Sequence, residues 1–217
     1  MSRCAYLLSL NKESERTIFC KDLLTKIGFM VVVVEFLPHP DPVLSNKQSM
    51  QHIYEMILDL SDNENEFSYV FEDDVNVHSD IKIDEIIKYE RLNDMFFYLG
   101  CCVPLELPPT NQRTGYSIMG YSIQSISGNV RGLHAIGLSK RGARELLKLV
   151  NTSKHNYMDM ILNDFSETYP ANVVRFDLQS YINGHRGMFF QDRKKFSSSI
   201  QQPIHENTPN PVINLDS

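Results

Sequence analysis

Three consecutive carboxylates, Glu72, Asp73 and Asp74, directly follow the apolar segment 67–71. Like charges repel one another, and a buried carboxylate is destabilising unless it is paired or ligated. A hard divalent cation such as Mg²⁺ or Mn²⁺ binds oxygen ligands and would neutralise this cluster. A solvated acidic loop after a strand is the alternative. Because the apolar Val75 follows at once, the cluster is not part of a polar tract, and we favour a metal site that also serves phosphate groups.

The length and composition of the chain indicate a folded protein. It has 217 residues, enough for one sizeable domain or two small ones, and it is 42% hydrophobic and 22% charged. The net charge is −6, and the one candidate for a basic patch is the segment 186–195. Proteins that bind a nucleic-acid backbone usually present a basic face, so nucleic acid is not the expected partner.

Cysteine spacing and hydropathy bear on the compartment. The four cysteines at 4, 20, 101 and 102 have no zinc-ligand spacing and no pattern typical of a small disulfide-bonded domain. Free thiols in a reducing compartment are the simplest interpretation. The apolar segment 4–10 is shorter than a signal peptide requires, and no stretch approaches the length of a membrane span. We therefore expect a soluble, cytoplasmic protein.

The first third of the chain alternates between strand and helix patterns. Strands are predicted at 4–9, 30–36 and 67–71, with helices between them at about 11–27 and 50–58. This β-α-β-α-β order implies right-handed crossovers and a mainly parallel sheet with helices on both faces. In such sheets ligands bind beyond the carboxyl ends of the strands. The acid cluster follows the third strand, so its position agrees with its chemistry.

Individual residues mark the boundaries of these elements. Asn11 is a candidate N-cap of the first helix, and Gly28 suits the left-handed residue that ends it. Four consecutive valines at 31–34 are typical of a central parallel strand that is buried on both faces. Three prolines between residues 38 and 42 predict a loop before the second helix.

The second half of the chain is less regular. Strands are predicted at 95–99, 133–138 and 172–176, with one or two more within 116–126. A polar, proline-bearing loop is expected at 104–115, and Ser139 is expected to cap a helix that runs to about residue 150. A further helix is predicted at 155–165. Beyond residue 190 the chain becomes polar, which favours an irregular tail.

Four sequence features occur here in an order that resembles known glycosyltransferases. Glu-Asp-Asp-Val at 72–75 resembles the metal-binding DxD-type motif of nucleotide-sugar glycosyltransferases with the GT-A fold. Leu-Ser-Leu-Asn at 8–11, followed by Glu-Arg at 15–16, resembles the opening pattern of glycosyltransferase family 25, which includes lipooligosaccharide and collagen glycosyltransferases. Leu-His-Ala-Ile-Gly-Leu-Ser-Lys-Arg-Gly-Ala at 133–143 and Tyr-Met-Asp at 157–159 are similar to later motifs of that family.

The resemblance covers roughly residues 3–185 and implies a fold and a function. The implied architecture is a single GT-A-like α/β domain at 1–190 with a mainly parallel central sheet flanked by helices, followed by an irregular tail at 191–217. The implied activity is metal-dependent transfer of a sugar from a nucleotide-sugar, in this family a UDP-sugar, to a glycan or glycoprotein acceptor. The compact size also resembles small glycosyltransferase domains of large algal viruses, which would place the protein in the host cytoplasm.

The resemblance also implies roles for the metal-side and donor-side residues. Asp74 corresponds to the metal ligand, and Glu72 and Asp73 correspond to donor contacts. His185 is the candidate that would complete the ligand shell of Mn²⁺ or Mg²⁺, and the flanking glycines would let the backbone approach a ligand closely. Arg186 is the candidate contact for phosphate oxygens. A surface turn with an exposed histidine is the open alternative for this segment.

Further candidates lie near the first strand and on the acceptor side. Asp159 would be the general base of an inverting enzyme, or else a carboxylate that stabilises the start of a helix. Asn11 and Arg16 follow the first strand and are candidate nucleotide contacts, although an N-cap role for Asn11 and a solvated Arg16 are equally compatible. His205 and Asp164 are weaker candidates for the metal and acceptor roles.

Two other function classes remain open on the sequence. One is a metal-dependent nucleotidyltransferase or phosphohydrolase, for which a glycine-rich or basic phosphate loop after the first strand would be expected. Residues 9–12, Ser-Leu-Asn-Lys, contain no such loop. The other is a non-catalytic module that binds a sugar or a nucleotide.

Overall fold

The computed structural model describes residues 3–60, 62–77, 80–91, 94–102, 110–118, 121–127, 131–169, 171–175 and 185–196. The helices are α1 (Glu15–Ile27), α2 (Pro42–Leu60), α3 (Ile83–Glu90), α4 (Lys140–Thr152) and α5 (Met158–Thr168). The strands are β1 (Arg3–Ser9), β2 (Phe29–Glu35), β3 (Phe67–Glu72), β4 (Val75–Val77), β5 (Phe96–Cys102), β6 (Thr110–Ile118), β7 (Tyr121–Ser127), β8 (Arg131–Ser139), β9 (Ala171–Arg175), β10 (His185–Gly187) and β11 (Phe189–Gln191).

One large mixed sheet forms the centre of the molecule. Its strand order is β2-β1-β3-β8-β5-β9-β7-β6, with β10 paired to β5. The β-α-β-α-β segment predicted for the first third is confirmed, because β1 lies parallel to both β2 and β3. The second half adds antiparallel pairs, since β8 enters between β3 and β5 in the opposite direction. The α/β class is therefore confirmed, but the sheet is mixed and not mainly parallel as predicted. The parallel arrangement applies to β2-β1-β3 and to β5-β9, whereas the other described pairings are antiparallel.

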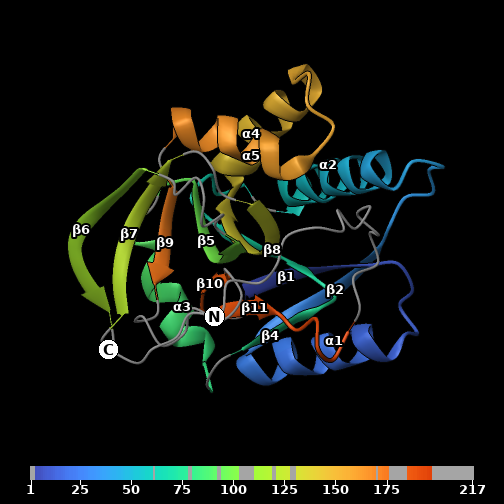
Figure 1. Cartoon of the computed structure of the whole chain (residues 1–217), viewed down its shortest axis with the longest axis horizontal. Helices are drawn as coiled ribbons and strands as arrows, with labels where there is room; N and C mark the ends of the chain where they lie inside the picture. Colours follow the sequence, from blue (N-terminus) through green and yellow to red (C-terminus); the bar gives the residue numbers. More distant parts are fainter. Residues whose placement is uncertain are drawn as a thin grey trace, which may run out of the picture.

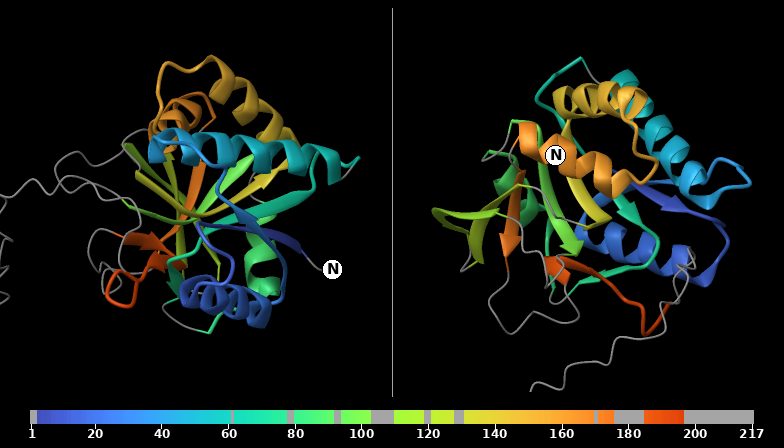
Figure 2. Two further views of the ribbon diagram at one scale, coloured as in Figure 1. Left: turned by 90° about the vertical axis from the view of Figure 1, so that its right-hand side faces the viewer. Right: turned by 45° about the horizontal axis from the view of Figure 1, so that its top comes forward.

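Helices cover both faces of the sheet and enclose two apolar cores. In Figure 1, α2, α4 and α5 lie above the sheet, while α1 and α3 lie below it. The upper core joins Met50 of α2 and Leu146 of α4 to sheet residues such as Ile136. The lower core joins Leu24 of α1 and Ile86 of α3 to the opposite face. Figure 2 shows the same three layers from two further directions.

The valine-rich strand does not occupy the centre of the sheet. β2 lies at the end of the described strand order, and Val31, Val32 and Val33 are only partly buried. The prediction of a central strand buried on both faces was therefore wrong. An apolar run reports β-propensity, whereas the position of a strand in a sheet depends on the neighbours that pair with it. β1 and β3, by contrast, are paired on both sides within the sheet, and most of their residues are buried.

Cap residues set the ends of α1 and α4. The N-cap of α1 is Ser14, whose side chain accepts a hydrogen bond from the backbone N–H of Thr17, so the prediction of Asn11 as the cap was wrong by one turn. Gly28 ends this helix in the left-handed conformation, with a φ of 119°, as predicted. The predicted cap at Ser139 is also confirmed, because its hydroxyl accepts from the Gly142 N–H at 3.1 Å.

Several segments differ from the sequence prediction. Residues 110–115 belong to β6 and not to a loop, and β6 and β7 form a hairpin with an irregular register. α2 begins at Pro42, a favourable first helical residue because it needs no N–H partner there. α3, β4, β10 and β11 have no counterpart in the prediction. The division into a domain at 1–190 and a tail stays a prediction. β11 crosses that boundary, and residues 197–217 lie outside the described part.

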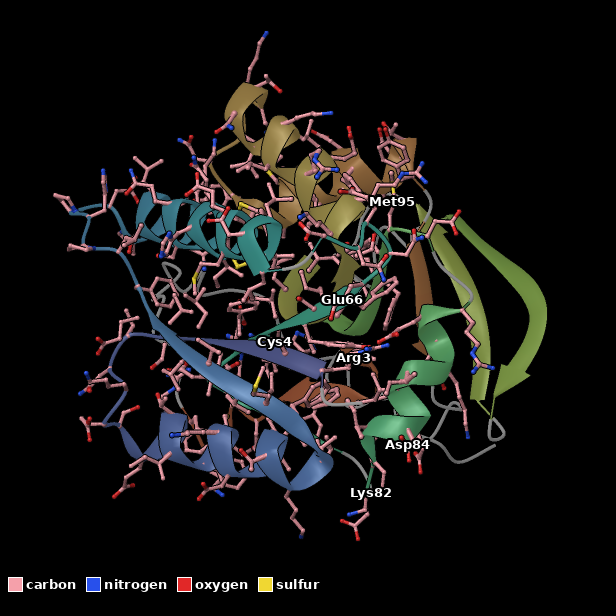
Figure 3. The ribbon with its side chains drawn as sticks, turned by 180° about the vertical axis from the view of Figure 1, so that it is seen from behind. Arg3, Cys4, Glu66, Lys82, Asp84 and Met95 are labelled. Carbon is pink, nitrogen blue, oxygen red and sulfur yellow. The ribbon has the colours of Figure 1, made fainter. Side chains whose placement is uncertain are left out.

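The amino ends of the central strands share one edge of the sheet. Figure 3 shows Arg3, Glu66 and Met95 following one another along this edge, with Lys82 and Asp84 beside them at the start of α3. The edge is closed by an ion pair in which the Arg3 guanidinium donates to both carboxylate oxygens of Glu90, at 2.7 and 2.6 Å. Because this edge is occupied by structural contacts, the acid cluster at the carboxyl ends is the better candidate site.

We expect Gly142→Ala to destabilise the protein. A Cβ atom at position 142 would collide with the backbone carbonyl oxygen of Met95, which already accepts the N–H of Ser139 at 2.8 Å. Overpacking against fixed backbone lowers the free energy of unfolding by about 2 kcal/mol. Helix propensity alone predicts the opposite sign, a gain of about 1 kcal/mol. Urea unfolding, with Arg141→Ala as an exposed control on the same turn, distinguishes the two. Equal stability of both variants would show that helix and strand do not approach this closely.

Candidate functional site

The topology brings most predicted site residues to the carboxyl edge of the central strands. β1 and β3 run parallel and deliver Ser9 and Glu72 to this edge. β10 runs antiparallel to β5, with His185 opposite Cys102 and Arg186 opposite Cys101. The backbone of the 185–186 segment therefore lies at the same edge as the acid cluster, although the structure describes no side chains for these two residues. His205 lies outside the described residues.

Asp73 is buried and bound by three side chains, which make four contacts with it. It is 5% exposed, and the Arg16 guanidinium lies 2.7 Å from its Oδ1. Its Oδ2 accepts from the hydroxyl of Ser9 at 2.9 Å and from that of Thr17 at 3.3 Å. Arg16 Nε also donates to the Asp73 backbone oxygen at 3.2 Å. Asp73 thus joins the end of β3 to the first turn of α1, where the helix macrodipole also favours a negative charge.

Asp74 and Glu72 point toward each other and have fewer partners. Asp74 is 4% exposed, and among the residues that the structure describes its Oδ1 has no hydrogen-bond partner. The amide Nε2 of Gln191 donates to Glu72 Oε2 at 2.7 Å and, more weakly, to Asp74 Oδ2 at 3.4 Å. The Arg16 guanidinium is 3.7 Å from Asp74 Oδ2. The two carboxylates therefore lie on either side of the position that the Gln191 amide nitrogen occupies.

The electrostatics of this pair favour an added positive charge. Burial, followed by the charge of Asp74, raises the pKa of Glu72 to about 8. Burial also raises the pKa of Asp74, although Arg16 and Arg193 act in the opposite direction. The raised pKa values show that burial disfavours the charged forms of both carboxyls more than the nearby arginines stabilise them. A cation bound between them would supply further positive charge.

A short segment after β10 packs against the acid cluster. We call residues 189–196 the strap. Its β11 strand pairs with β4, so that Gln191 lies opposite Val75. The Asp192 N–H donates to the Asp74 backbone oxygen at 2.8 Å, and Asn76 Nδ2 donates to Asp192 Oδ2 at 3.0 Å. Figure 1 shows the strap continuing along α1, where Phe196 contacts Phe19.

The remaining predicted residues are placed as follows. Asn11 is exposed at the end of β1, and its side chain accepts from the Glu13 N–H at 2.9 Å. Arg16 forms an ion pair with Asp73 of the acid cluster. The alternative that its side chain is simply solvated was therefore wrong. Asp159 lies at the start of α5, and its charge contributes, after burial and Cys101, to raising the pKa of the buried Tyr98.

Asp159 and the acid cluster lie on different sides of the sheet. Tyr98 packs in the core under α2, α4 and α5, whereas Asp73 contacts α1. α2 follows the carboxyl end of β2, and Lys47 Nζ near its start donates to the His155 backbone oxygen at 2.9 Å, so the segment just before α5 lies near the carboxyl edge. A substrate that contacts both Asp159 and Asp74 would have to lie across this edge.

Sequence reasoning missed the polar groups that hold the acid cluster. Ser9 and Thr17 donate to Asp73, and Gln191 donates to Glu72 and Asp74. Arg193 in turn donates to Gln191 Oε1 at 3.1 Å. Ser9 ends the first strand. Its position could have predicted the contact with the acid cluster, because parallel strands end at the same edge of a sheet. Gln191 had no such signal, since 119 positions separate it from Glu72.

The residues present fit a divalent cation. Glu72 and Asp74 are oxygen donors, the kind that Mg²⁺ and Mn²⁺ prefer, and Asp74 Oδ1 is buried without a hydrogen-bond partner in the described part of the chain. The described side chains contain no cluster of three or more His, Cys, Asp and Glu groups that could hold a metal. The carboxylate pair would therefore need a further ligand of another kind or from another segment.

No protein-family model matches the sequence, and no curated protein matches it. Among solved structures, the fold is similar to that of a UTP-bound UGPase from Acinetobacter baumannii, with a TM-score of 0.54 and 10% sequence identity over 88% of each chain. The chain is a single GT-A-like α/β domain. A UDP-glucose pyrophosphorylase from the same species gives a TM-score of 0.47 and 15% identity, over 83% of this chain and 65% of that chain. None of the described helices combines the length and apolar character of a membrane span.

Proposed function

We propose that this chain is a divalent-metal-dependent transferase that acts on a nucleotide-sugar. The observation that carries the proposal is the buried Asp74 Oδ1, without a hydrogen-bond partner among the described residues, beside Glu72 at the carboxyl edge of a GT-A-like sheet. Glu72 and Asp74 would hold Mn²⁺ or Mg²⁺, and the cation would neutralise negative charge on the phosphates. The similarity to a UTP-bound UGPase supports a uridine nucleotide as the ligand.

The chain's own residues would position the metal and the phosphates. Asp73 and Arg16 fix the turn between β3 and β4, which sets the direction of Glu72 and Asp74. Arg193 is exposed beside the pair, and Arg186 lies on β10 at the same edge. Guanidinium groups bind phosphate oxygens with good geometry, so these two arginines are the proposed phosphate contacts.

One candidate reaction is nucleotidyl transfer. An oxygen of a sugar 1-phosphate forms a bond to the α-phosphorus of UTP, and pyrophosphate leaves. The similarity to the UTP-bound UGPase favours this reaction.

The second candidate reaction is glycosyl transfer to a glycan or glycoprotein. An acceptor hydroxyl oxygen forms a bond to the anomeric carbon, and UDP leaves. In an inverting enzyme, Asp159 would take the hydroxyl proton. The glycine-free segment 10–14 after β1 and the location of the segment before α5 near the site edge favour this reaction. The resemblance to glycosyltransferase family 25, the viral relationship and the cytoplasmic location stay predictions.

Product analysis tests the proposal. The protein is incubated with UTP and glucose 1-phosphate, and separately with UDP-glucose and other UDP-sugars, each with Mn²⁺ or with EDTA. Pyrophosphate release identifies nucleotidyl transfer, and slow UDP release from a UDP-sugar identifies glycosyl transfer. We expect one of the two, and only with the metal. Mn²⁺-dependent binding of UDP without any turnover would instead show a non-catalytic binding module.

A further inference from the structure

Gln191 occupies the place between the two carboxylates that a cation would take. Its amide nitrogen is within hydrogen-bond distance of both Glu72 and Asp74, and the residue is only 9% exposed. The amide is the polar group that bridges the pair, and it carries only a partial positive charge. Arg16, at 3.7 Å from Asp74 Oδ2, and Arg193 supply positive charge nearby, but they do not offset the effect of burial on either carboxylate.

The orientation of this amide is set from outside by Arg193. The guanidinium donates to Gln191 Oε1 at 3.1 Å, which leaves the Nε2 side facing the acids. Arg193 itself is exposed, so a ligand in solvent can reach its guanidinium. A continuous series of hydrogen bonds therefore leads from the Arg193 guanidinium through the Gln191 amide to the two carboxylates.

A divalent cation would reverse the preference of the amide. With a cation between Glu72 and Asp74, the Nε2 group would face positive charge, whereas a half-turn of the amide would present the carbonyl oxygen instead. Oxygen is the ligand type that Mg²⁺ and Mn²⁺ prefer. After the half-turn, Oε1 no longer accepts a hydrogen bond from Arg193. The guanidinium can then bind an anionic group in place of the neutral amide oxygen.

We propose that Gln191 is a ligand of the divalent cation, and that its half-turn on metal binding transfers Arg193 from Gln191 to the phosphates of the nucleotide. This inference rests on the proposed metal-dependent function. It makes metal binding and nucleotide binding mutually reinforcing through two described residues. By linkage, the nucleotide must then tighten the metal by the same factor by which the metal tightens the nucleotide.

Mn²⁺ titration followed by electron paramagnetic resonance tests the assignment without relying on activity. We expect Gln191→Leu to weaken Mn²⁺ binding by about 10-fold or more, in the range seen when groups around a metal are removed. Gln51→Leu is the matched control, because the Gln51 amide donates to the carboxylate of Glu55 at 3.3 Å on the distant helix α2. It should leave Mn²⁺ affinity unchanged. Melting curves in EDTA verify that each variant is folded.

Arg193→Met provides an independent second variant. It removes the hydrogen bond that holds Gln191 Nε2 toward the acids, so its Mn²⁺ affinity should equal or exceed that of the wild type. By calorimetry, UDP affinity should fall about 10-fold in the presence of Mn²⁺, the value of one charge-assisted hydrogen bond, and should stay unchanged in EDTA.

Contrary results separate this assignment from the proposed function. If the wild-type protein binds Mn²⁺ and Gln191→Leu binds it equally or more tightly, the amide only fills the empty site and the assignment is overturned. If Arg193→Met lowers UDP affinity equally with and without Mn²⁺, the transfer of Arg193 is wrong. If the wild-type protein binds no Mn²⁺, both this assignment and the proposed function fail.

Discussion

Asp74→Asn is expected to abolish metal-dependent turnover while leaving the protein folded. The substitution keeps the shape of the side chain but removes the negative charge that faces Glu72 and the buried oxygen that has no hydrogen-bond partner in the described structure. Loss of groups around a metal lowers affinity or activity 10–100-fold, and a direct ligand should lie at about the upper end or beyond. We therefore expect kcat/KM to fall by at least about 100-fold.

The stability of this variant provides the control. Because burial raises the pKa of Asp74, ionising this carboxyl costs more free energy in the folded, metal-free protein than in the unfolded chain. A neutral isostere removes that penalty, so the melting temperature in EDTA should equal or exceed that of the wild type. The increase in melting temperature that Mn²⁺ gives the wild type should disappear. Asp74→Asn that kept its Mn²⁺-dependent stabilisation and its turnover would exclude Asp74 as a ligand.

Arg16→Ala is expected to lower the free energy of unfolding by about 3–5 kcal/mol, the range for breaking a buried ion pair by removing one partner. Asp73 is 5% exposed, and Arg16 is the cation that contacts its Oδ1. The hydroxyls of Ser9 and Thr17 would still donate to Oδ2, so the carboxylate would keep hydrogen bonds without a counter-charge. Urea unfolding measures the loss.

A double-mutant cycle with Asp73→Asn identifies the cause of this loss. Once Asp73 is neutral, removing Arg16 should have a much smaller effect, and the difference is the coupling between the two side chains. A direct role of Arg16 in nucleotide binding gives a different result. In that case Arg16→Ala would unfold at the wild-type urea concentration, and only the affinity for UDP would decrease.

Predictions from the sequence were most accurate where the signal was local. The apolar segment before Glu72 identified β3, and the alternation of strand and helix patterns identified the parallel unit formed by β1, β2 and β3. Gly28 and Ser139 marked helix ends correctly, because a cap depends on residues within one turn. Asn11 was misassigned as a cap because Ser14, three positions later, offers the same chemistry.

The sequence by itself determined that three acids follow a buried strand and that this strand end lies at the carboxyl edge of an α/β sheet. The tertiary structure decided what each acid does. Asp73 turns inward to Arg16, whereas Glu72 and Asp74 face Gln191, which arrives from a strap more than 100 positions later. Hydrophobic periodicity reports how one segment is buried, because burial repeats with the geometry of that segment. The partners of a side chain come from distant segments that meet only when the chain folds. A local sequence pattern therefore cannot predict them.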